Sequence, residues 1–500
     1  MTLKSKKMSS TIHRSLSKKR KRGYAQKRKF KPEVCQSNMT FEECELAVLR
    51  QAVDNNQKIK GEKMVNKAEI QKMINIVENF LEKKKLLCYG GTAINNILPK
   101  EAQFYDYNTD VPDYDFFSDD ALNHAKELAD IYDKNGYSNV EAKSGMHHGT
   151  YKVFVNFIPM ADITSIHPQL FKALYKKSLK VAGIHYVPPD FLRMSMYLEL
   201  SRPEGDVSRW EKVLKRLTLL NQFHPVEMPE EGCKDVLFQR PLDNHPEKAQ
   251  HIFDAVRTVF IEMGAVFFGG YANALYSRYM PQKHRDVLQP YPDFDVLHED
   301  PERCAKIITE RLEYLDIEAE QNIKIINHTA IGELIPESVE IQVNKDTVAF
   351  IYKPIACHNY NVLKLDGREL RVATIDTILS FYLAFLFIDQ PIFSAFKNRH
   401  LCLSNFLFEL EEKNRLAQKG LLRRFTPTCY GTQETLESIR AQKAAKFAEL
   451  KTNRNSTEYQ EWFLYYNPSA PSTNKTKKTT SVASTTVKKK KMNKLWPEFW

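Results

Sequence analysis

Apolar residues in two stretches of the chain recur three or four positions apart, which is the spacing of one helix face. In each stretch a short apolar run follows, at residues 86–89 and 265–268, and predicts a buried strand. A Gly-Gly pair and a further short helix come next. The helical positions are Ile70, Ile74, Val77 and Leu81 in the first stretch, and Ile252, Val256, Val259 and Phe260 in the second.

The two stretches are copies of one pattern. The sequence holds only two Gly-Gly pairs and only two Asp-x-Asp triplets, and each pair precedes one triplet at nearly the same distance. Gly91 lies 22 residues before Asp113, and Gly270 lies 23 residues before Asp293. Such spacing indicates a duplicated domain rather than a short repeat. The order of helices and strands predicts an α+β fold with a mixed sheet in each of two tandem domains.

Three acids of the first copy are candidates for a catalytic metal site. Asp113 and Asp115 are two positions apart on a predicted strand, so both carboxylates lie on one face. Alternating residues 151–157 predict a second strand, after which Asp162 stands between apolar neighbours and is expected to project into the same site. Carboxylate oxygens bind Mg²⁺, which also binds nucleotide phosphates. The pattern predicts two metal ions, with Asp162 as a candidate proton acceptor.

The first Gly-Gly pair is a candidate phosphate-binding turn. Gly90 and Gly91 allow a close approach of the backbone, and their N–H groups can bind phosphate oxygens, as can the Thr92 hydroxyl. A lone Gly-Gly is usually an ordinary turn. Its combination with a following Asp-x-Asp and a third acid is much rarer, and it favours a functional site.

Residues 188–221 predict two helices interrupted at 203–205. Arg202, Trp210 and Lys212 are candidate nucleotide-binding residues there, together with Lys215, and Trp210 is a candidate for stacking on a base. A packed position for Trp210 is an equally good interpretation. The turn at residues 147–149 could cover the nucleotide, but we favour the interpretation that it is a plain polar hairpin.

The second copy keeps Asp293 and Asp295, but its third position is doubtful. A constant offset from Asp162 places that position at Glu340 or Gln342, and a Gln cannot serve as a charged ligand. Tyr271 also replaces Thr92. We therefore expect this copy to be degenerate, although a live second site stays open because two acids are present.

The excess of positive over negative charge is confined to the two ends of the chain. The net charge is +11, residues 1–31 hold 13 Lys or Arg, and residues 474–494 hold 8 Lys, with no acid in either segment. Such segments are typically disordered and bind polyanions, of which RNA is one. The alternatives to RNA binding are a solvated tail and a nuclear localisation signal at residues 18–22.

The remaining composition excludes several classes of protein. The eight cysteines form no C-x-x-C pair, which argues against a structural zinc site and predicts reduced thiols. The N-terminus lacks the apolar segment of a secretory signal. The uncharged stretch 377–388 is too short to cross a membrane and predicts a buried helix.

The domain boundaries that we predict follow these shifts in pattern. They are a disordered basic tail at 1–31, a catalytic domain at 32–185, a helical connector at 186–235, a degenerate second domain at 236–375, a C-terminal helical region at 376–467 and a basic low-complexity tail at 468–500.

The motifs carry a family resemblance. Gly90-Gly91-Thr92, Asp113-Tyr114-Asp115 and Asp162 resemble the signature of the DNA polymerase β-like nucleotidyltransferase superfamily. Residues 86–221 are similar to the poxvirus-type poly(A) polymerase catalytic subunit and its giant-virus relatives, most clearly at 191–203 and 209–213. The resemblance weakens through the second copy and does not reach the tails.

The resemblance implies a poly(A) polymerase that adds AMP from ATP to an RNA 3′ end with Mg²⁺ or Mn²⁺. It also implies two nucleotidyltransferase-like folds, of which the second is inactive, and a location in the virion or the cytoplasmic virus factory. The family makes long poly(A) tails either with a processivity partner or as a homodimer. Two alternatives remain: another terminal nucleotidyltransferase that adds U, CCA or oligoadenylate, and a non-catalytic RNA-binding protein.

Overall fold

The computed structural model describes residues 34–470 apart from 36–37, 66–67, 107–109, 234–235, 237–239, 241–246, 280–290, 315–321, 333, 366, 389 and 415–416. The two basic segments 1–31 and 474–494, and the predictions made for them, lie outside the described residues. Across the described part, no helix is long and apolar enough to cross a membrane.

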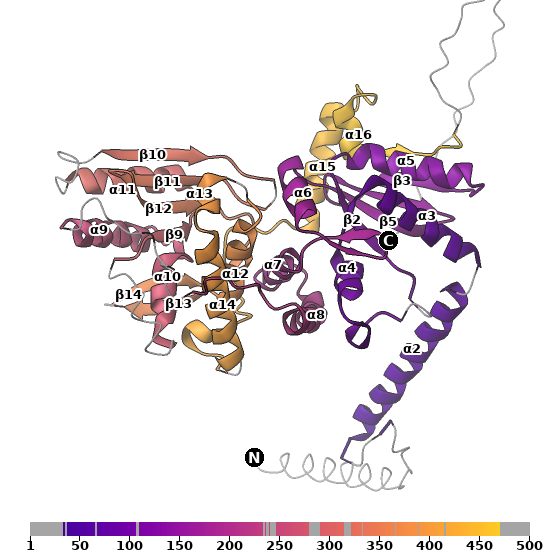
Figure 1. Cartoon of the computed structure of the whole chain (residues 1–500), viewed down its shortest axis with the longest axis horizontal. Helices are drawn as coiled ribbons and strands as arrows, with labels where there is room; N and C mark the ends of the chain where they lie inside the picture. Colours follow the sequence, from indigo (N-terminus) through magenta and orange to yellow (C-terminus); the bar gives the residue numbers. More distant parts are fainter. Residues whose placement is uncertain are drawn as a thin grey trace, which may run out of the picture.

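Two eight-stranded mixed sheets form two lobes, which lie side by side along the molecule (Figure 1). The first sheet has, in spatial order, β16 (Tyr465–Tyr466), β3 (Val140–Ser144), β4 (Thr150–Val155), β5 (Ile158–Ser165), β2 (Tyr114–Ser118), β1 (Leu87–Tyr89), β7 (Ile184–Tyr186) and β6 (Leu179–Val181). The second has β10 (Ile323–His328), β11 (Ser338–Val343), β12 (Asp346–Tyr352), β9 (Phe294–Leu297), β8 (Val266–Phe267), β14 (Arg368–Ala373), β13 (His358–Leu365) and β15 (Cys429–Tyr430).

The two sheets repeat one topology. In each, a strand before the Gly-Gly turn pairs antiparallel with the strand that carries Asp-x-Asp, as β1 does with β2 and β8 with β9. The Asp-x-Asp strand then pairs parallel with the next strand outward, β2 with β5 and β9 with β12. This agreement confirms the predicted α+β fold with two tandem copies.

Amphipathic helices cover the sheets, as the apolar spacing predicts. In the first lobe these are α3 (Ala68–Lys84) and α5 (Ala121–Lys134), and in the second lobe α9 (Ala249–Glu262) and α11 (Pro301–Tyr314). The predicted apolar positions of α3 and α9 are all buried. Short helices α4 (Gly90–Ile97) and α10 (Gly270–Tyr276) begin within the two Gly-Gly turns.

Helices fill the space between the lobes. The connector forms α7 (Pro189–Leu200) and α8 (Trp210–Phe223), the two helices predicted for residues 188–221. α7 packs on α12 (Ile375–Phe385), which is buried along its whole length, and α12 packs on α14 (Lys397–Asn414). The remaining short helices here are α6 (Pro168–Lys176) and α13 (Pro391–Ser394). This packing joins the two copies through one continuous apolar core.

The C-terminal segment returns from the second lobe to the first. α15 (Leu436–Leu450) and α16 (Thr457–Phe463) lie above the first sheet in Figure 1, and β16 adds to its edge beside β3. Hydrogen bonds hold this segment there, since Tyr465 donates to Glu141 and Tyr466 donates to Asp130. The region predicted at 376–467 is therefore divided between both lobes.

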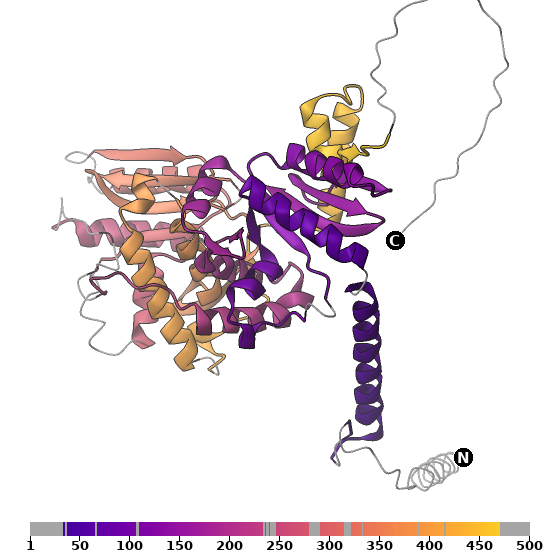
Figure 2. The same cartoon turned by 45° about the vertical axis from the view of Figure 1, so that its right-hand side comes forward.

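One helix stands apart from both lobes. α2 (Phe41–Val65) projects from the first lobe in both views (Figures 1 and 2). Apolar side chains on it are 40–58% exposed, namely those of Phe41, Leu46, Val48, Leu49, Val53 and Ile59.

Six of the eight cysteines form disulfides, which corrects the prediction of reduced thiols. The pairs are Cys35–Cys44, Cys233–Cys402 and Cys357–Cys429, with Cα–Cα distances of 5.1, 5.6 and 5.2 Å. Their separations of 9, 169 and 72 residues follow no recognisable sequence spacing, so only the fold reveals them. Cys88 and Cys304 are free and buried.

Candidate active site

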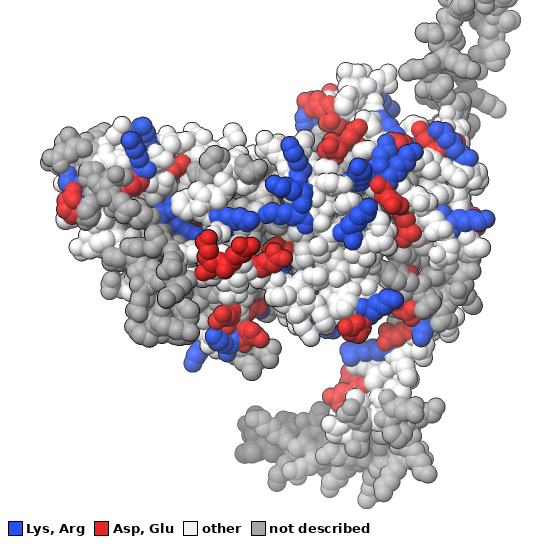
Figure 3. All heavy atoms as spheres, viewed as in Figure 1, with Lys and Arg blue, Asp and Glu red and all other residues white. Residues whose placement is uncertain are grey.

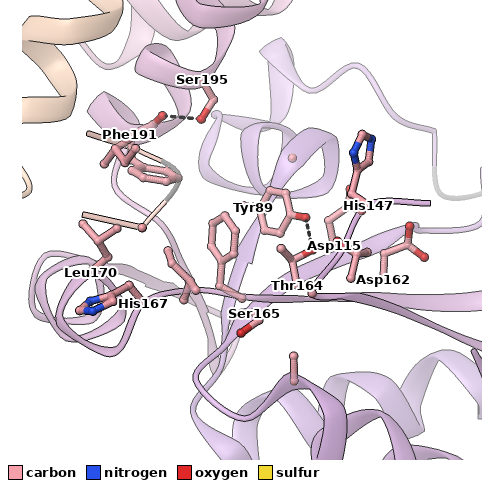
Figure 4. A pocket seen from close by; sticks show the side chains of 18 of the residues that line it. Tyr89, Asp115, His147, Asp162, Thr164, Ser165, His167, Leu170, Phe191 and Ser195 are labelled. Carbon is pink, nitrogen blue, oxygen red and sulfur yellow. Dashed lines mark hydrogen bonds between the residues drawn. The ribbon is translucent and has the colours of Figure 1, made fainter. Parts of the chain in front are cut away.

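The three candidate acids meet at the middle of the first sheet. Asp115 and Asp162 are directly paired on the parallel strands β2 and β5. Asp113 lies two residues before Asp115, and its side chain therefore lies on the same face. Figure 4 shows Asp115 and Asp162 side by side, with His147 above them. The predicted convergence of two separate segments is thus present in the structure.

Burial and the charges of neighbouring acids raise the pKa of two of the three acids, Asp113 and Asp115. Burial first, and then the charges of Asp113 and Asp162, raise the pKa of Asp115 to about 7. Burial and Asp162 also raise the pKa of Asp113. Lys152, which lies opposite Asp162 on β4, forms an ion pair with it and offsets part of this repulsion. Carboxylate oxygens from neighbouring strands are the hard ligands that a divalent cation prefers.

The Gly-Gly turn lies directly over these acids and has no room for side chains. Gly90 has a φ of +74°, and a Cβ on it would lie 2.6 Å from Oδ2 of Asp115. A Cβ on Gly91 would lie 2.4 Å from the Tyr105 hydroxyl and 2.9 Å from a guanidinium nitrogen of Arg216. Glycine at these two positions is therefore a requirement of close packing.

Thr92 ties this turn to the acid strand. Its side chain is buried, and its hydroxyl donates to the carbonyl oxygen of Asp113 at 2.6 Å. Thr92 is not among the residues that line the cavity at the acids. Its hydroxyl thus positions Asp113 in this structure, whereas the sequence suggested a phosphate donor.

One face of α8 supplies positive charge. Arg209, Lys212 and Arg216 all line the cavity. The nearby charge of Arg216, followed by burial, lowers the pKa of Lys212, as expected for cations gathered without enough anions. Sequence reasoning identified Lys212 but missed the other two, although their spacing of three and four residues marks one helix face. It named Lys215 instead, which is exposed and pairs with Glu211.

Arg216 is held in place by aromatic residues. It donates to the Tyr105 hydroxyl at 2.8 Å, and its guanidinium lies 4.7 Å from the centre of the Phe104 ring. A cation fixed above Gly91 in this way is well placed to bind an anion at the turn.

Two predicted nucleotide-binding residues lie elsewhere. Trp210 donates from its indole nitrogen to the carbonyl oxygen of Glu199 at 3.0 Å, and its ring is 5.6 Å from that of Phe425. Arg202 lies in the turn after α7, close enough to His358 to affect its charge. Neither residue is among those lining the cavity.

A cavity of about 1090 Å³ opens over the acids and takes its walls from distant parts of the chain. The turn that holds His147 and His148 forms one side, together with Thr457 and Glu461 of α16. Gly332 of the second lobe also lies in the wall. The turn at 147–149, predicted as a plain hairpin, therefore borders the site.

The second copy has a different residue at the third position. β12 pairs parallel with β9 so that Phe350 lies opposite Asp295, as Asp162 lies opposite Asp115. The prediction of Glu340 or Gln342 is wrong, because both belong to the next strand, β11. Glu340 pairs with Phe350 and so corresponds to Lys152 of the first copy.

Arginine side chains occupy the space beside the remaining acids of the second copy. Arg240 forms ion pairs with Asp293 at 2.7 Å and Asp295 at 3.0 Å, and its guanidinium lies 4.8 Å from the ring centre of Phe350. Arg399 pairs with Asp293 at 3.1 Å. Although burial opposes them, these two arginines lower the pKa of Asp293. All of these charged side chains are buried.

Sequence comparison matches part of the first lobe and the connector to one family. Residues 75–206 match the family described as poly(A) polymerase catalytic subunit. A protein of African swine fever virus, named "Putative poly(A) polymerase catalytic subunit", is 30% identical over 180 residues, 35% of this chain and 38% of its own length. A mimivirus protein of the same name is 28% identical over 200 residues, 39% of this chain and 32% of its own. The chain thus spans less than half the length of these curated relatives.

Structural comparison covers much more of the molecule. The crystal structure of the Megavirus polyadenylate synthase superposes with a TM-score of 0.71 over 87% of both chains, at 20% sequence identity. That likeness extends to the second lobe, which the family match at residues 75–206 does not reach. The chain therefore carries a match to the poly(A) polymerase catalytic subunit family in residues 75–206, and it shares its two-lobed fold with a viral polyadenylate synthase.

Proposed function

We propose that this protein is a poly(A) polymerase, which adds AMP from ATP to an RNA 3′ end without a template. The observation that carries the proposal is the pairing of Asp115 with Asp162 beneath the Gly-Gly turn, within the segment that matches the family. In the reaction, the RNA 3′-hydroxyl oxygen forms a bond to the α-phosphorus of ATP. The bond from that phosphorus to the bridging oxygen breaks, and pyrophosphate leaves.

Separate residues of the chain accept the proton, bind the triphosphate and neutralise its charge. Asp162 accepts the proton of the attacking hydroxyl, since its strand β5 is separated by β2 from β1 and the Gly-Gly turn, where the triphosphate binds. The N–H groups of Gly90 and Gly91 bind the triphosphate, and Lys212 and Arg216 neutralise it. Preorganised donors of this kind stabilise charge that develops on the transferred phosphoryl group.

The donor set fits Mg²⁺ or Mn²⁺. Asp113, Asp115 and Asp162 offer hard oxygen ligands, and their mutual repulsion favours a divalent cation between them. Bound there as a pair, such ions would supply Lewis-acid stabilisation of the attacking and leaving oxygens.

RNA is the acceptor that the surface favours. Figure 3 shows Lys and Arg side chains in a broken band across the middle of one face, from the second lobe over α6 to the first lobe. A single strand can follow such a band through phosphate contacts. The matching proteins are viral, and we propose the virion and the cytoplasmic virus factory as the location, with a processivity partner or a homodimer supporting long tails.

A second candidate is another terminal nucleotidyltransferase, because the same acids would serve addition of U, CCA or oligoadenylate. A non-catalytic RNA-binding protein is disfavoured by the convergence of all three acids. Incubation of the full chain with a single-stranded oligoribonucleotide, Mg²⁺ or Mn²⁺, and each NTP separately tests the proposal. Extension with ATP alone is expected.

The controls decide between the alternatives. Asp113→Asn and Asp115→Asn should abolish extension while leaving oligonucleotide binding and the thermal unfolding midpoint nearly unchanged. Preferred extension with UTP or CTP would favour the second candidate. If wild-type protein bound the oligonucleotide but extended it with no nucleotide, the enzyme proposal would be wrong.

A further inference from the structure

We propose that His148 and Trp462 form a stacking site for the 3′-terminal base of the RNA. The inference rests on the proposed function and assigns a role to the C-terminal segment. His148 is in the turn between β3 and β4, and Trp462 is in α16. Their ring centroids are 4.3 Å apart at an interplanar angle of 40°. His148 is exposed and Trp462 half-buried, so ring surface is available to a ligand.

One member of the pair lines the cavity over the acids, and the other follows a residue that does. His148 lines the cavity, and so does Glu461, the residue before Trp462. Figure 4 shows the neighbouring His147 on the same side of the sheet as Asp162, and both residues line the cavity. The pair thus belongs to the rim of the candidate active site, although its members are separated by most of the chain.

Long-range hydrogen bonds hold both halves of the pair. Lys443 of α15 donates to the carbonyl oxygen of Gly145 at 2.5 Å, which fixes the turn before His148. The Tyr151 hydroxyl donates to the carbonyl oxygen of Glu461 at 3.3 Å. Lys126 of α5 donates to the Gln460 side chain at 2.5 Å, which fixes α16. A stacking surface positioned by such contacts loses little freedom when a base binds.

The order of the strands indicates that His148 and Trp462 bind a base of the RNA rather than the base of ATP. The Gly-Gly turn follows β1, the acids lie on β2 and β5, and β4 comes next in the sheet. The triphosphate needs the N–H groups of the turn and the cations of α8, which places it on the β1 side. The attacking hydroxyl must lie in line with the leaving group, on the opposite side of the phosphorus. That side is β4 and its turn, where His148 and Trp462 lie.

The chemistry of the pair suits a primer end of any sequence. Aromatic rings stack on every base, because each base has a π-face. Lys152 on β4, with a side chain 40% exposed, lies beside Asp162 and can contact the backbone phosphate of the same nucleotide. Stacking would thus hold the last base while the hydroxyl of its ribose faces the acids.

Steady-state extension of an oligoadenylate with ATP tests the assignment. In Trp462→Ala and in His148→Ala, the KM for the oligonucleotide should rise about tenfold, the size expected for loss of one base stack, while the KM for ATP stays unchanged. Trp462→Phe should restore most of the loss, because it keeps an aromatic face. Tyr465→Phe is the matched control, since it alters an aromatic residue of the same segment at the outer edge beside Glu141 and removes only one hydrogen bond.

Direct binding separates this inference from the proposed function. Fluorescence anisotropy of a 5′-labelled oligoadenylate, measured without ATP, should show the same weakening in Trp462→Ala even if no extension occurs. An oligonucleotide with 4-thiouridine at its 3′ end should cross-link to His148 or Trp462. A rise in the KM for ATP alone would move the pair to the nucleotide site. Unchanged oligonucleotide affinity in both variants, with normal unfolding midpoints, would reduce the pair to a packing contact and overturn the proposal.

Discussion

The two sheets of this protein share one topology and each has an Asp-x-Asp pair, yet only in the first does a third acid lie opposite the pair on the next strand. On the strand beside the pair, the first copy has Asp162 where the second has Phe350. One strand further out, Lys152 of the first copy corresponds to Glu340 of the second. The comparison teaches that two Asp-x-Asp pairs on equivalent strands can have different surroundings, because the residue opposite them on the next strand differs.

The second difference between the copies is the surroundings of the Asp-x-Asp carboxylates, which face a cavity in the first copy and buried arginines in the second. Asp113 is exposed to the cavity, whereas Asp293 is buried and turned back toward its own Gly-Gly turn, with Oδ1 2.4 Å from where a Cβ of Gly270 would lie. Arg240 and Arg399 then neutralise the buried acids. A buried carboxylate pair needs compensating charge, and in the second copy the protein itself supplies it.

The largest expected effect is on the rate of RNA extension, and it should follow loss of the third acid in the first copy but not loss of an acid in the second. Asp162→Asn should lower the rate of extension about a thousandfold or more, because it removes a ligand and the proton acceptor. Glu340→Gln should leave the rate within about twofold of wild type. Single-turnover extension with saturating ATP measures both. Equal losses in the two variants would mean that the second copy takes part in the chemistry.

The next effect concerns stability. Arg240→Met leaves two buried carboxylates with only Arg399 to compensate them, and should lower the free energy of unfolding by about 3–5 kcal/mol. Arg209→Met is the matched control in the first lobe, where the arginine is 56% exposed and pairs with Glu199, and it should cost less than about 1 kcal/mol. Urea unfolding followed by tryptophan fluorescence measures both.

A result in which Arg240→Met is as stable as wild type would contradict this view of the second copy. It would mean that the acids there are already neutral, or that another cation replaces the arginine. Adding Asp293→Asn and Asp295→Asn to Arg240→Met should recover part of the loss, since fewer uncompensated charges then remain buried.

A smaller expected effect is on the pH dependence of the free energy of unfolding, to which a buried histidine of the second lobe contributes. Burial lowers the pKa of His358 to about 3, and its ring nitrogens find no hydrogen-bond partner among the described residues. Below its ordinary value of 6.5, the unfolded chain takes up a proton that the folded chain does not, so stability falls between pH 6.5 and about 3. The slope is at most about 1.4 kcal/mol per pH unit.

The raised pKa of Asp115 acts in the opposite direction, so the test compares variants rather than absolute slopes. His358→Phe should flatten the loss of unfolding free energy between pH 6.5 and 5.5 relative to wild type. His148→Gln, at an exposed histidine, should leave the loss unchanged. If His358→Phe matched wild type at both pH values, the buried histidine would not be neutral as inferred.

The sequence predicted the parts of the site that depend on local pattern. The apolar spacing of α3 and α9, the strands beside the Gly-Gly turns and the acids of the first copy all follow from periodicity over a few residues. It failed where the answer depends on strand register. Phe350 lies further along the chain than a constant offset from Asp162 allows, and no local signal shows which residue faces Asp295.

Long-range contacts were also hidden from the sequence. Arg240 lies far from Asp293 along the chain and far from any motif, and only the folded second lobe brings them together. The return of α16 to the first lobe, the partner of His148, and the disulfides Cys233–Cys402 and Cys357–Cys429 have the same origin. The sequence left Trp210 equally open to stacking on a base and to packing, and only the fold shows that its indole nitrogen donates to the carbonyl oxygen of Glu199.

The central claim is that divalent cations bind the first copy and not the second. Diffraction from crystals grown with ATP and Mn²⁺, recorded at the manganese absorption edge, tests it directly. Anomalous density is expected among Asp113, Asp115 and Asp162, with none beside Asp293 and Asp295, where Arg240 remains in place. Manganese density at Asp293, or its absence at Asp162 while ATP is bound, would contradict the account.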